Sequence, residues 1–174
     1  MTTPFVIREA EPEDFAALGQ VMAAVYEGLE GFPGRAEQPK YYEMLDAIGQ
    51  MTTRAGARLL VATVEGRVLG GVVYFSDLAQ YGSDGTATQE RNASGFRLLA
   101  VSPEARGLGL GKGLVEACIG LAKEHQHRQM IIHTTEAMKV AWGMYERLGF
   151  RRSPDLDFMQ GALPVFGFRL DLKI

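Results

Sequence analysis

The chain is poor in cysteine, in long apolar runs and in excess positive charge, and each shortage excludes a class of protein. With one cysteine, Cys118, it can form neither an intramolecular disulfide nor a cysteine metal cluster. The segment up to Arg8 lacks the cationic start and apolar core of a signal peptide. No stretch approaches the ~18 consecutive apolar residues of a membrane-spanning helix. These absences predict a cytoplasmic protein with no membrane partner.

Charge and histidine content narrow the classes further. The net charge of −3 argues against a dedicated nucleic-acid binder, which is usually basic, so no nucleic-acid partner is expected. His125, His127 and His133 show no ligand spacing with one another or with carboxylates, which predicts no metal site. With 47% hydrophobic and 22% charged residues the chain can build an ordinary core, and residues 1–174 are expected to form a single domain.

Residue periodicity predicts an α/β fold whose sheet is mixed, as in α+β proteins, with helices on both faces of that sheet. Gly70 and Gly71 interrupt one β-rich run, which suggests a bulge or close backbone packing. The predicted order is β-α-α-β-β-β-α-β-α-β-β. Strands are expected at 5–8, 59–64, 68–75, 96–101, 130–134, 150–153 and 165–172, and helices from Pro12, over about 40–51, over about 109–125, and from a Thr134 or Thr135 cap to about 148.

The strongest chemical signal is a glycine-rich turn after the fourth predicted strand. An apolar run ends at Val101, and glycines then alternate at 107, 109, 111 and 113; the cations Arg106 and Lys112 belong to the same stretch. Backbone N–H groups approach a ligand closely where side chains are absent, and those at a helix start are unpaired and lie at the positive end of the dipole. The stretch therefore predicts a phosphate site.

Two familiar phosphate motifs do not fit this turn. A P-loop needs a glycine five positions before Gly-Lys and a Ser or Thr after it, but Arg106 and Gly113 stand there. A dinucleotide fingerprint needs G-x-G-x-x-G, and its last position is Lys112 in one register and Leu114 in the other.

The pattern [Q/R]-x-x-G-x-[G/A] does fit, and a second block supports it. The first block reads Arg106-Gly107-Leu108-Gly109-Leu110-Gly111 and follows Leu99-Ala100-Val101-Ser102-Pro103. The second, from Ala141 to Phe150, reads A-x-x-x-Y-x-x-x-G-F. Together, one strand apart, they resemble the GCN5-related N-acetyltransferases (GNAT). The order of elements also agrees, so the resemblance covers nearly the whole chain.

The resemblance implies acetyl-CoA as co-substrate, no metal, and a single N-acetyltransferase domain over residues 1–174. It implies that backbone N–H groups from Gly107 to Lys112 bind the pyrophosphate, with charge added by Arg106 and Lys112. It also implies that the pantetheine arm pairs with the backbone of Leu99, Ala100 and Val101 like an added strand, in a splayed central sheet. The structural alternatives are a turn that only packs a helix and an ordinary buried strand.

The same resemblance makes Tyr145 the acid that protonates the leaving thiolate. A phenol, with a pKa of about 10, is close enough to a thiol at about 8.5 for this transfer. The alternative is a tyrosine packed on an apolar helical stripe. The family often has Asn seven positions before the tyrosine, where this chain has Met138, so Thr134 or Thr135 is expected to supply a hydroxyl instead.

The acceptor, an unidentified amine, is expected between the loops 28–40, 77–94 and 154–164. Their aromatic residues either wall a cleft or anchor the loops: Phe32, Tyr41, Tyr81 and Phe158. The general base stays open among four acidic residues: Glu27, Glu30, Asp77 and Glu90.

Arg97 stands where an acidic residue is the more familiar base. If its side chain faces the acceptor, it favours a substrate with a carboxylate or phosphate. The predicted function is direct transfer of an acetyl group to a small-molecule or protein amine in a ternary complex. A non-catalytic acyl-CoA sensor and a transferase of a bulkier acyl group are the alternatives, and a homodimer is left open.

Overall fold

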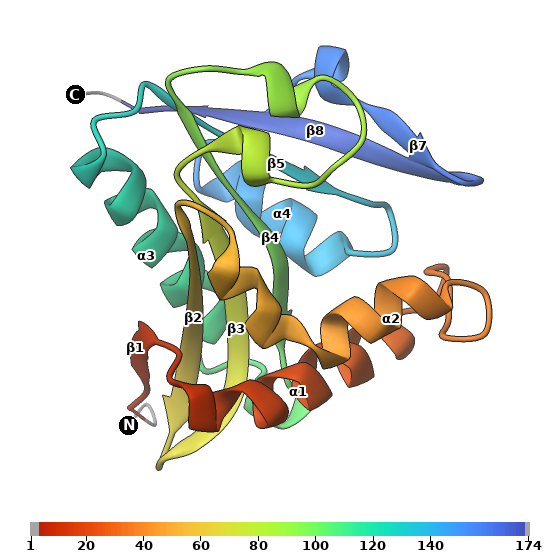
Figure 1. Ribbon diagram of the computed structural model, residues 1–174, viewed down its shortest axis with the longest axis vertical. Helices are drawn as coiled ribbons and strands as arrows, with labels where there is room; N and C mark the ends of the chain where they lie inside the picture. The colour runs from red at the N-terminus through yellow and green to blue at the C-terminus, as the bar shows by residue number, and fades with distance from the viewer. Residues whose placement is uncertain (1–3, 173–174) are drawn as a thin grey trace.

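A computed structural model describes residues 4–172, which form one eight-stranded sheet (Figure 1). The strand order is β1-β2-β3-β4-β5-β8-β6, and β7 pairs with β8 outside this path. Only the β4–β5 pair is parallel among the described strands. The strands are β1 (Val6–Glu9), β2 (Ala57–Val64), β3 (Arg67–Phe75), β4 (Ala93–Val101), β5 (Gln129–Thr134), β6 (Arg151–Arg152), β7 (Phe158–Gln160) and β8 (Leu163–Asp171).

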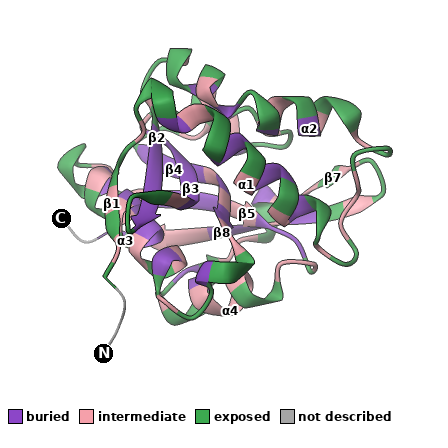
Figure 2. Ribbon diagram, turned by 90° about the horizontal axis from the view of Figure 1, so that it is seen from below, coloured by how far each residue is buried: buried purple, intermediate pink, exposed green. Residues whose placement is uncertain are grey.

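Helices cover both faces of the sheet, as predicted. On one face α1 (Phe15–Glu27) and α2 (Pro39–Asp46) pack on a cluster that includes Leu18, Leu45 and Val73. On the other, α3 (Leu110–Glu124) and α4 (Lys139–Arg147) pack on a second cluster. Figure 2 shows the central strands largely buried and the outer helix faces exposed. The buried sheet thus separates two hydrophobic cores.

Three local predictions were wrong. The α-helix expected to reach residue 51 ends at Asp46 and gives way to a 3₁₀ segment over Ile48–Thr53, where Gly49 packs so tightly on Phe15 that a Cβ would lie 2.2 Å from its ring. The loop 154–164 contains β7. The last helix begins only at Lys139, with Met138 at its N-cap and no side-chain cap; Thr135 lies before it and accepts the Met138 N–H through its backbone carbonyl.

The sheet opens between β4 and β5. The two strands pair over residues 93–95 and 129–131, and then separate, while β5 stays paired to β8 as far as Thr134. Within β4 the register to β3 shifts, and Leu98 has a φ of 63°, so a bulge bends the strand at this point. The predicted splay is therefore present, and it leaves one side of β4 unpaired beyond Gly95.

The glycines predicted to mark a bulge or close packing in β3 do both. The β2–β3 register shifts next to the pair formed by Ala62 and Gly70. A Cβ at Gly71 would lie 2.5 Å from Leu18 Cδ1 of α1 and 2.8 Å from the Leu60 carbonyl oxygen. Glycine at 71 therefore sets how closely α1 approaches the sheet.

Substitution of Gly71 tests this close approach. Gly71→Ala should lower the free energy of unfolding by about 1–3 kcal/mol, since overpacked core sites cost that much. Gly120→Ala is the matched control. Gly120 lies in α3 with open space around its Cβ position, so alanine there should raise stability by up to about 1 kcal/mol. Urea unfolding of both variants measures the pair, and equal stabilities would contradict the packing argument.

Candidate functional site

A cavity of about 830 Å³ lies where β4 and β5 separate. Its walls come from both sides of the sheet: α1 and the α1–α2 loop, the loop before β4, β4 itself, the glycine turn, the end of β5, α4 and the β7–β8 hairpin. The residues that the sequence marked for two different tasks, the glycine turn and the aromatic loops, thus border one continuous space.

The glycine turn presents a row of free backbone donors to this cavity. Among the described residues, the N–H groups of Gly107, Gly109, Leu110, Gly111 and Lys112 make no hydrogen bond within the protein. Gly109 forms the N-cap of α3 with a φ of 89°. Arg106 and Lys112 are exposed, line the cavity and form no ion pair within residues 4–172. The turn has the donors and the charge of an anion site.

Gly111 and Gly113 lack side chains for different reasons. A Cβ at Gly113 would lie 2.9 Å from the Phe5 ring, so packing requires glycine there. At Gly111 the neighbours would be 3.7 Å or more away, at ordinary contact distance, and its φ is helical. Packing does not require glycine at 111, and the missing side chain leaves space beside the free N–H groups of the turn.

The unpaired stretch of β4 is fixed from α1. The Tyr26 hydroxyl, from a side chain buried at 3% exposure, donates to the Leu99 carbonyl at 2.9 Å. This hydrogen bond lies beside the bulge at Leu98 and orients a carbonyl that has no partner on β5. Burial raises the pKa of Tyr26 well above its usual value, so the phenol stays protonated and keeps donating.

Tyr145 projects from α4 into the floor of the cavity. Its ring is 4% exposed and packs edge-on against Phe96 of β4 and against Phe150. Burial raises the pKa of its phenol, which is therefore protonated at neutral pH, as a proton donor must be. Tyr145 belongs to an apolar cluster and also lines the cavity, so its packing is confirmed and its catalytic role stays a prediction.

The threonines near the missing asparagine have different surroundings. The Thr134 hydroxyl contacts the Met138 sulfur at 3.4 Å. Thr135 lines the cavity at 3% exposure, and its Oγ1 is buried without a hydrogen-bond partner among the described residues. Of the two, Thr135 carries the hydroxyl that lacks a partner.

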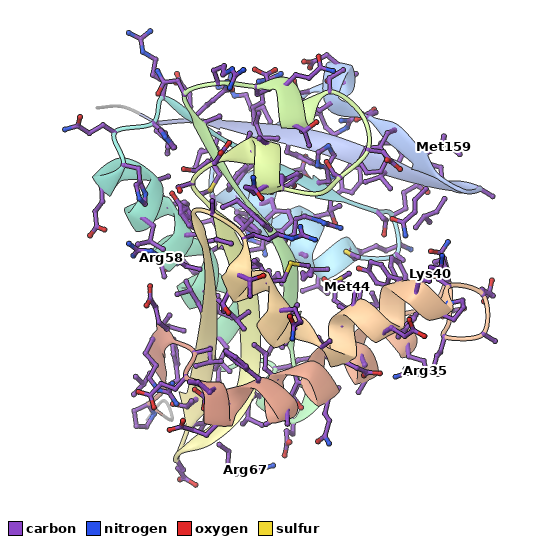
Figure 3. All side chains as sticks on the ribbon, in the orientation of Figure 1. Arg35, Lys40, Met44, Arg58, Arg67 and Met159 are labelled. Atoms are coloured by element: carbon purple, nitrogen blue, oxygen red, sulfur yellow. The ribbon has the colours of Figure 1, made fainter. Side chains whose placement is uncertain are left out.

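Aromatic residues enclose the far end of the cavity. Phe32, Tyr41, Tyr81 and Phe158 all line it, and they come from α2 and the three loops that the sequence assigned to the acceptor. The start of α2 and β7 face each other across this end, where Gln160 Nε2 donates to Gln38 Oε1 at 3.4 Å. In Figure 3, Lys40 and Met159 mark these two rims on the same side of the molecule.

A tyrosine and a histidine close the wall between β4 and β5. His133 Nε2 lies 2.9 Å from the Leu156 carbonyl and must donate to it, so Nδ1 of the neutral ring accepts from the Tyr81 hydroxyl at 3.0 Å. Burial, and then the nearby Arg97 cation, lower the pKa of His133. The ring is therefore neutral at pH 7.

All ionised side chains in the cavity lining are cationic: Arg97, Arg106, Lys112, Lys139 and Arg147. Within residues 4–172 no Asp or Glu lines it, including the four carboxylates considered as bases. Glu27 lies 3.7 Å from Arg35, Glu90 pairs with Arg169, and Asp77 accepts the Ala79 N–H. Glu30 borders a separate depression.

The structure brings nearly all of the sequence-predicted residues to this cavity. Among the predicted cofactor and catalytic residues Leu108 is the exception, because its N–H bonds to the Ala105 carbonyl and its side chain packs on the core. The four candidate bases lie outside the cavity as well. Sequence reasoning missed Tyr26 and His133. Tyr26 follows Val25 in an ordinary amphipathic helix, and nothing in the local sequence reveals that its partner is Leu99.

Comparison with known proteins agrees with this geometry. The model of the acetyltransferase (GNAT) family matches residues 22–150, which include the bulged strand, the glycine turn and Tyr145. The chain belongs to this family. The GNAT fold also accounts for the open sheet: an acetyltransferase of the GNAT family from Staphylococcus aureus superposes with a TM-score of 0.74 at 18% identity, covering 98% of this chain and all of that one.

Two further relatives carry more specific names. The PaiA N-acetyltransferase of Thermoplasma acidophilum, solved in complex with coenzyme A, superposes with a TM-score of 0.75 at 14% identity over 97% of this chain and 99% of that one. A mycothiol acetyltransferase of Cellulomonas flavigena is 30% identical over 109 residues, 63% of this chain. This GNAT chain spans 30% of the length of that curated relative.

Neither a membrane-spanning helix nor a metal-binding cluster is found in residues 4–172. No helix in residues 4–172 is both long and apolar enough to cross a bilayer. Over the same part of the chain, no three His, Cys, Asp or Glu side chains converge on a point that could hold a metal ion. Cys118 is fully buried, and burial raises the pKa of its thiol, so this cysteine is a core residue of the GNAT fold.

The buried His133 should make stability depend on pH. Because its folded pKa lies below the usual 6.5, the unfolded chain binds more protons as pH falls through that value, and the free energy of unfolding decreases there. His133→Gln should flatten this slope between pH 7 and 5. His127→Gln is the comparison. Burial lowers the pKa of His127 as well, but this histidine contacts Ser94 outside the cavity, so its own effect on the slope can be measured separately. Urea unfolding at several pH values checks the slope, and an unchanged slope in His133→Gln contradicts the assignment.

Proposed function

We propose that the chain is an acetyl-CoA-dependent N-acetyltransferase that moves the acetyl group directly to an amine held in the same cavity. The observation that carries the proposal is the continuity of that cavity. A turn with five free N–H donors lies at one end, an aromatic chamber at the other, and Tyr145 between them in the lining. Donor and acceptor can therefore be present together, as direct transfer in a ternary complex requires.

The residues fit the parts of acetyl-CoA. The turn 107–112, with Arg106 and Lys112, would bind the pyrophosphate, and the vacant Cβ position of Gly111 leaves room for it. The unpaired backbone of Leu99, Ala100 and Val101 would pair with the pantetheine amides, as a peptide does when it adds to a strand. The complex of PaiA N-acetyltransferase with coenzyme A, on the same fold, supports this assignment.

Tyr145 would act as the general acid. The acceptor nitrogen attacks the thioester carbonyl carbon, a C–N bond forms, and the C–S bond breaks. Tyr145 gives its hydroxyl proton to the departing sulfur, and the proton lost by the nitrogen restores the phenol. Burial raises the pKa of a thiol as it raises that of a phenol, so the two stay matched in this site.

The amine would enter already neutral. With no carboxylate in the described cavity lining, a base of that type is not in place. The cationic lining and the apolar walls lower the pKa of an ammonium group held in the cavity, so the cavity binds the neutral amine in preference to the ammonium ion.

Thiol release from acetyl-CoA, measured against a panel of amines and peptides, tests the proposal. Turnover with at least one acceptor is expected. Tight acetyl-CoA binding with no turnover in the whole panel would favour the alternative, a non-catalytic acyl-CoA sensor. Faster release from a longer acyl-CoA would favour transfer of a bulkier group.

Placing a charge at Gly111 tests the anion cradle. Gly111→Asp should weaken coenzyme A binding at least about tenfold, because a carboxylate there repels phosphate and takes the free N–H groups. The fold should survive, since the added Cβ has room and an acidic residue suits a helix start. Gly120→Asp adds the same charge on the open side of α3 and serves as control. Calorimetric titration with coenzyme A measures both, and equal affinities would refute the cradle.

Removal of the Tyr145 hydroxyl tests its chemical role. Tyr145→Phe should lower kcat by about 10- to 10⁴-fold, the range of a general acid, while coenzyme A affinity stays close to that of the parent protein. The ring contacts with Phe96 and Phe150 remain, so stability should change little. Single-turnover thiol release reads the chemical step, and an unchanged rate would remove Tyr145 from the mechanism.

A further inference from the structure

Arg97 is a cation without a counter-ion on the acceptor side of the cavity. Its Nη1 donates to the Tyr81 carbonyl at 3.0 Å, and its guanidinium lies 5.7 Å from the centre of the Tyr81 ring. An arginine has five N–H donors, and within residues 4–172 the others of Arg97 have no acceptor. No Asp or Glu of the described chain lies within ion-pair distance.

A second arginine, Arg54, lies outside the cavity lining but beside the same turn at Gly82. Arg54 Nη1 donates to the Gln80 carbonyl at 3.1 Å. A Cβ built on Gly82 would lie 2.7 Å from Arg54 Nη1 and 3.3 Å from Arg97 Nη1. Two guanidinium groups therefore flank one turn, and neither forms an ion pair in the described chain. Arg54 thus adds positive charge beside Arg97, which favours an anion at this end of the cavity.

The neighbours of Arg97 are aromatic. Beside the larger effect of burial, its positive charge acts to lower the pKa of each of four neighbouring groups: Tyr26, Tyr41, Tyr81 and His133. All four line the cavity, together with Phe32 and Phe158. Low dielectric walls strengthen the attraction between a guanidinium and an incoming anion.

From this arrangement we propose that the acceptor is a small amine that also carries a carboxylate. The carboxylate pairs with Arg97, and an apolar or aromatic body packs against Phe32, Tyr41 and Phe158. This inference rests on the proposed acetyl transfer and names its substrate class. It also explains the absence of acidic residues from the described lining, since a carboxylate in the wall would repel such an acceptor.

Matched acceptors separate the carboxylate from the rest of the molecule. We would measure thiol release with alanine, leucine, methionine, phenylalanine and tryptophan, and with the amide of each. The acids should be preferred in kcat/KM by at least about tenfold in the best pair, as a charge-assisted pair predicts. The comparison works against the acids, because the amine of an amino acid amide is less protonated and therefore more reactive than that of the acid. A preference for the acids is thus underestimated. Amides acetylated as fast as the acids throughout the series would overturn the inference.

Variants at Arg97 locate the recognition. Arg97→Gln keeps an N–H donor for the Tyr81 carbonyl and removes the charge, so the ratio of acid to amide kcat/KM should fall toward one. Arg97→Lys keeps the charge and should retain most of the ratio. Arg151→Gln removes an exposed arginine of β6 outside the cavity lining and is the matched control. A ratio that survives in Arg97→Gln would refute the assignment.

A binding measurement separates this inference from the proposed function. With coenzyme A present, 3-phenylpropanoate should bind more tightly than 3-phenylpropanamide, and Arg97→Gln should abolish the difference. Equal binding of the two probes would overturn the carboxylate site even in an active acetyltransferase. Binding that depends on Arg97, without turnover on any amine, would uphold the site and overturn acetyl transfer.

Discussion

The separation of β4 from β5 is the constraint on which the rest of the site depends. A parallel pair that continued to the ends of both strands would satisfy every backbone group and leave no cavity. Here the pairing stops after Gly95 and Ile131, whereas β5 pairs with β8 along its full length. The bulge at Leu98, a left-handed conformation that costs a non-glycine residue about 1–2 kcal/mol, directs β4 away. The rings of Phe96 and Tyr145 pack in the angle between the strands.

Glycines serve this arrangement in distinct ways. Gly71 lets α1 approach the sheet, which brings the Tyr26 hydroxyl to the Leu99 carbonyl. Gly113 lets α3 approach Phe5 at the start of the chain. Gly109 supplies the positive φ at the helix start, whereas Gly111 leaves open space at the surface of the turn. Glycine thus allows the close packing of α1 and α3, and it leaves the surface of the turn 107–112 open.

Sequence reasoning recovered what depends on neighbouring residues. The turn 106–112 and the block around Tyr145 are local patterns, and the order of the long elements follows from periodicity. The bulge at Leu98 was hidden because no residue type marks it. The bond from Tyr26 to Leu99 and that from Tyr81 to His133 join distant segments, so only the folded chain reveals them. The three-residue strand β7 was missed because so short a segment has no periodicity to detect.

The open side of β4 is also an edge strand placed inside a protein. Unpaired strand edges at the rim of a sheet attract other chains and promote aggregation, and proteins usually keep such edges short. The outer strands β1 and β6 obey that rule, with four and two residues. The long edge, from Phe96 to Val101, is instead walled by helices on both faces of the sheet (Figure 1). A strand of another protein would bring side chains against the helices on both faces. A slender extended molecule, without such side chains, suits this edge better.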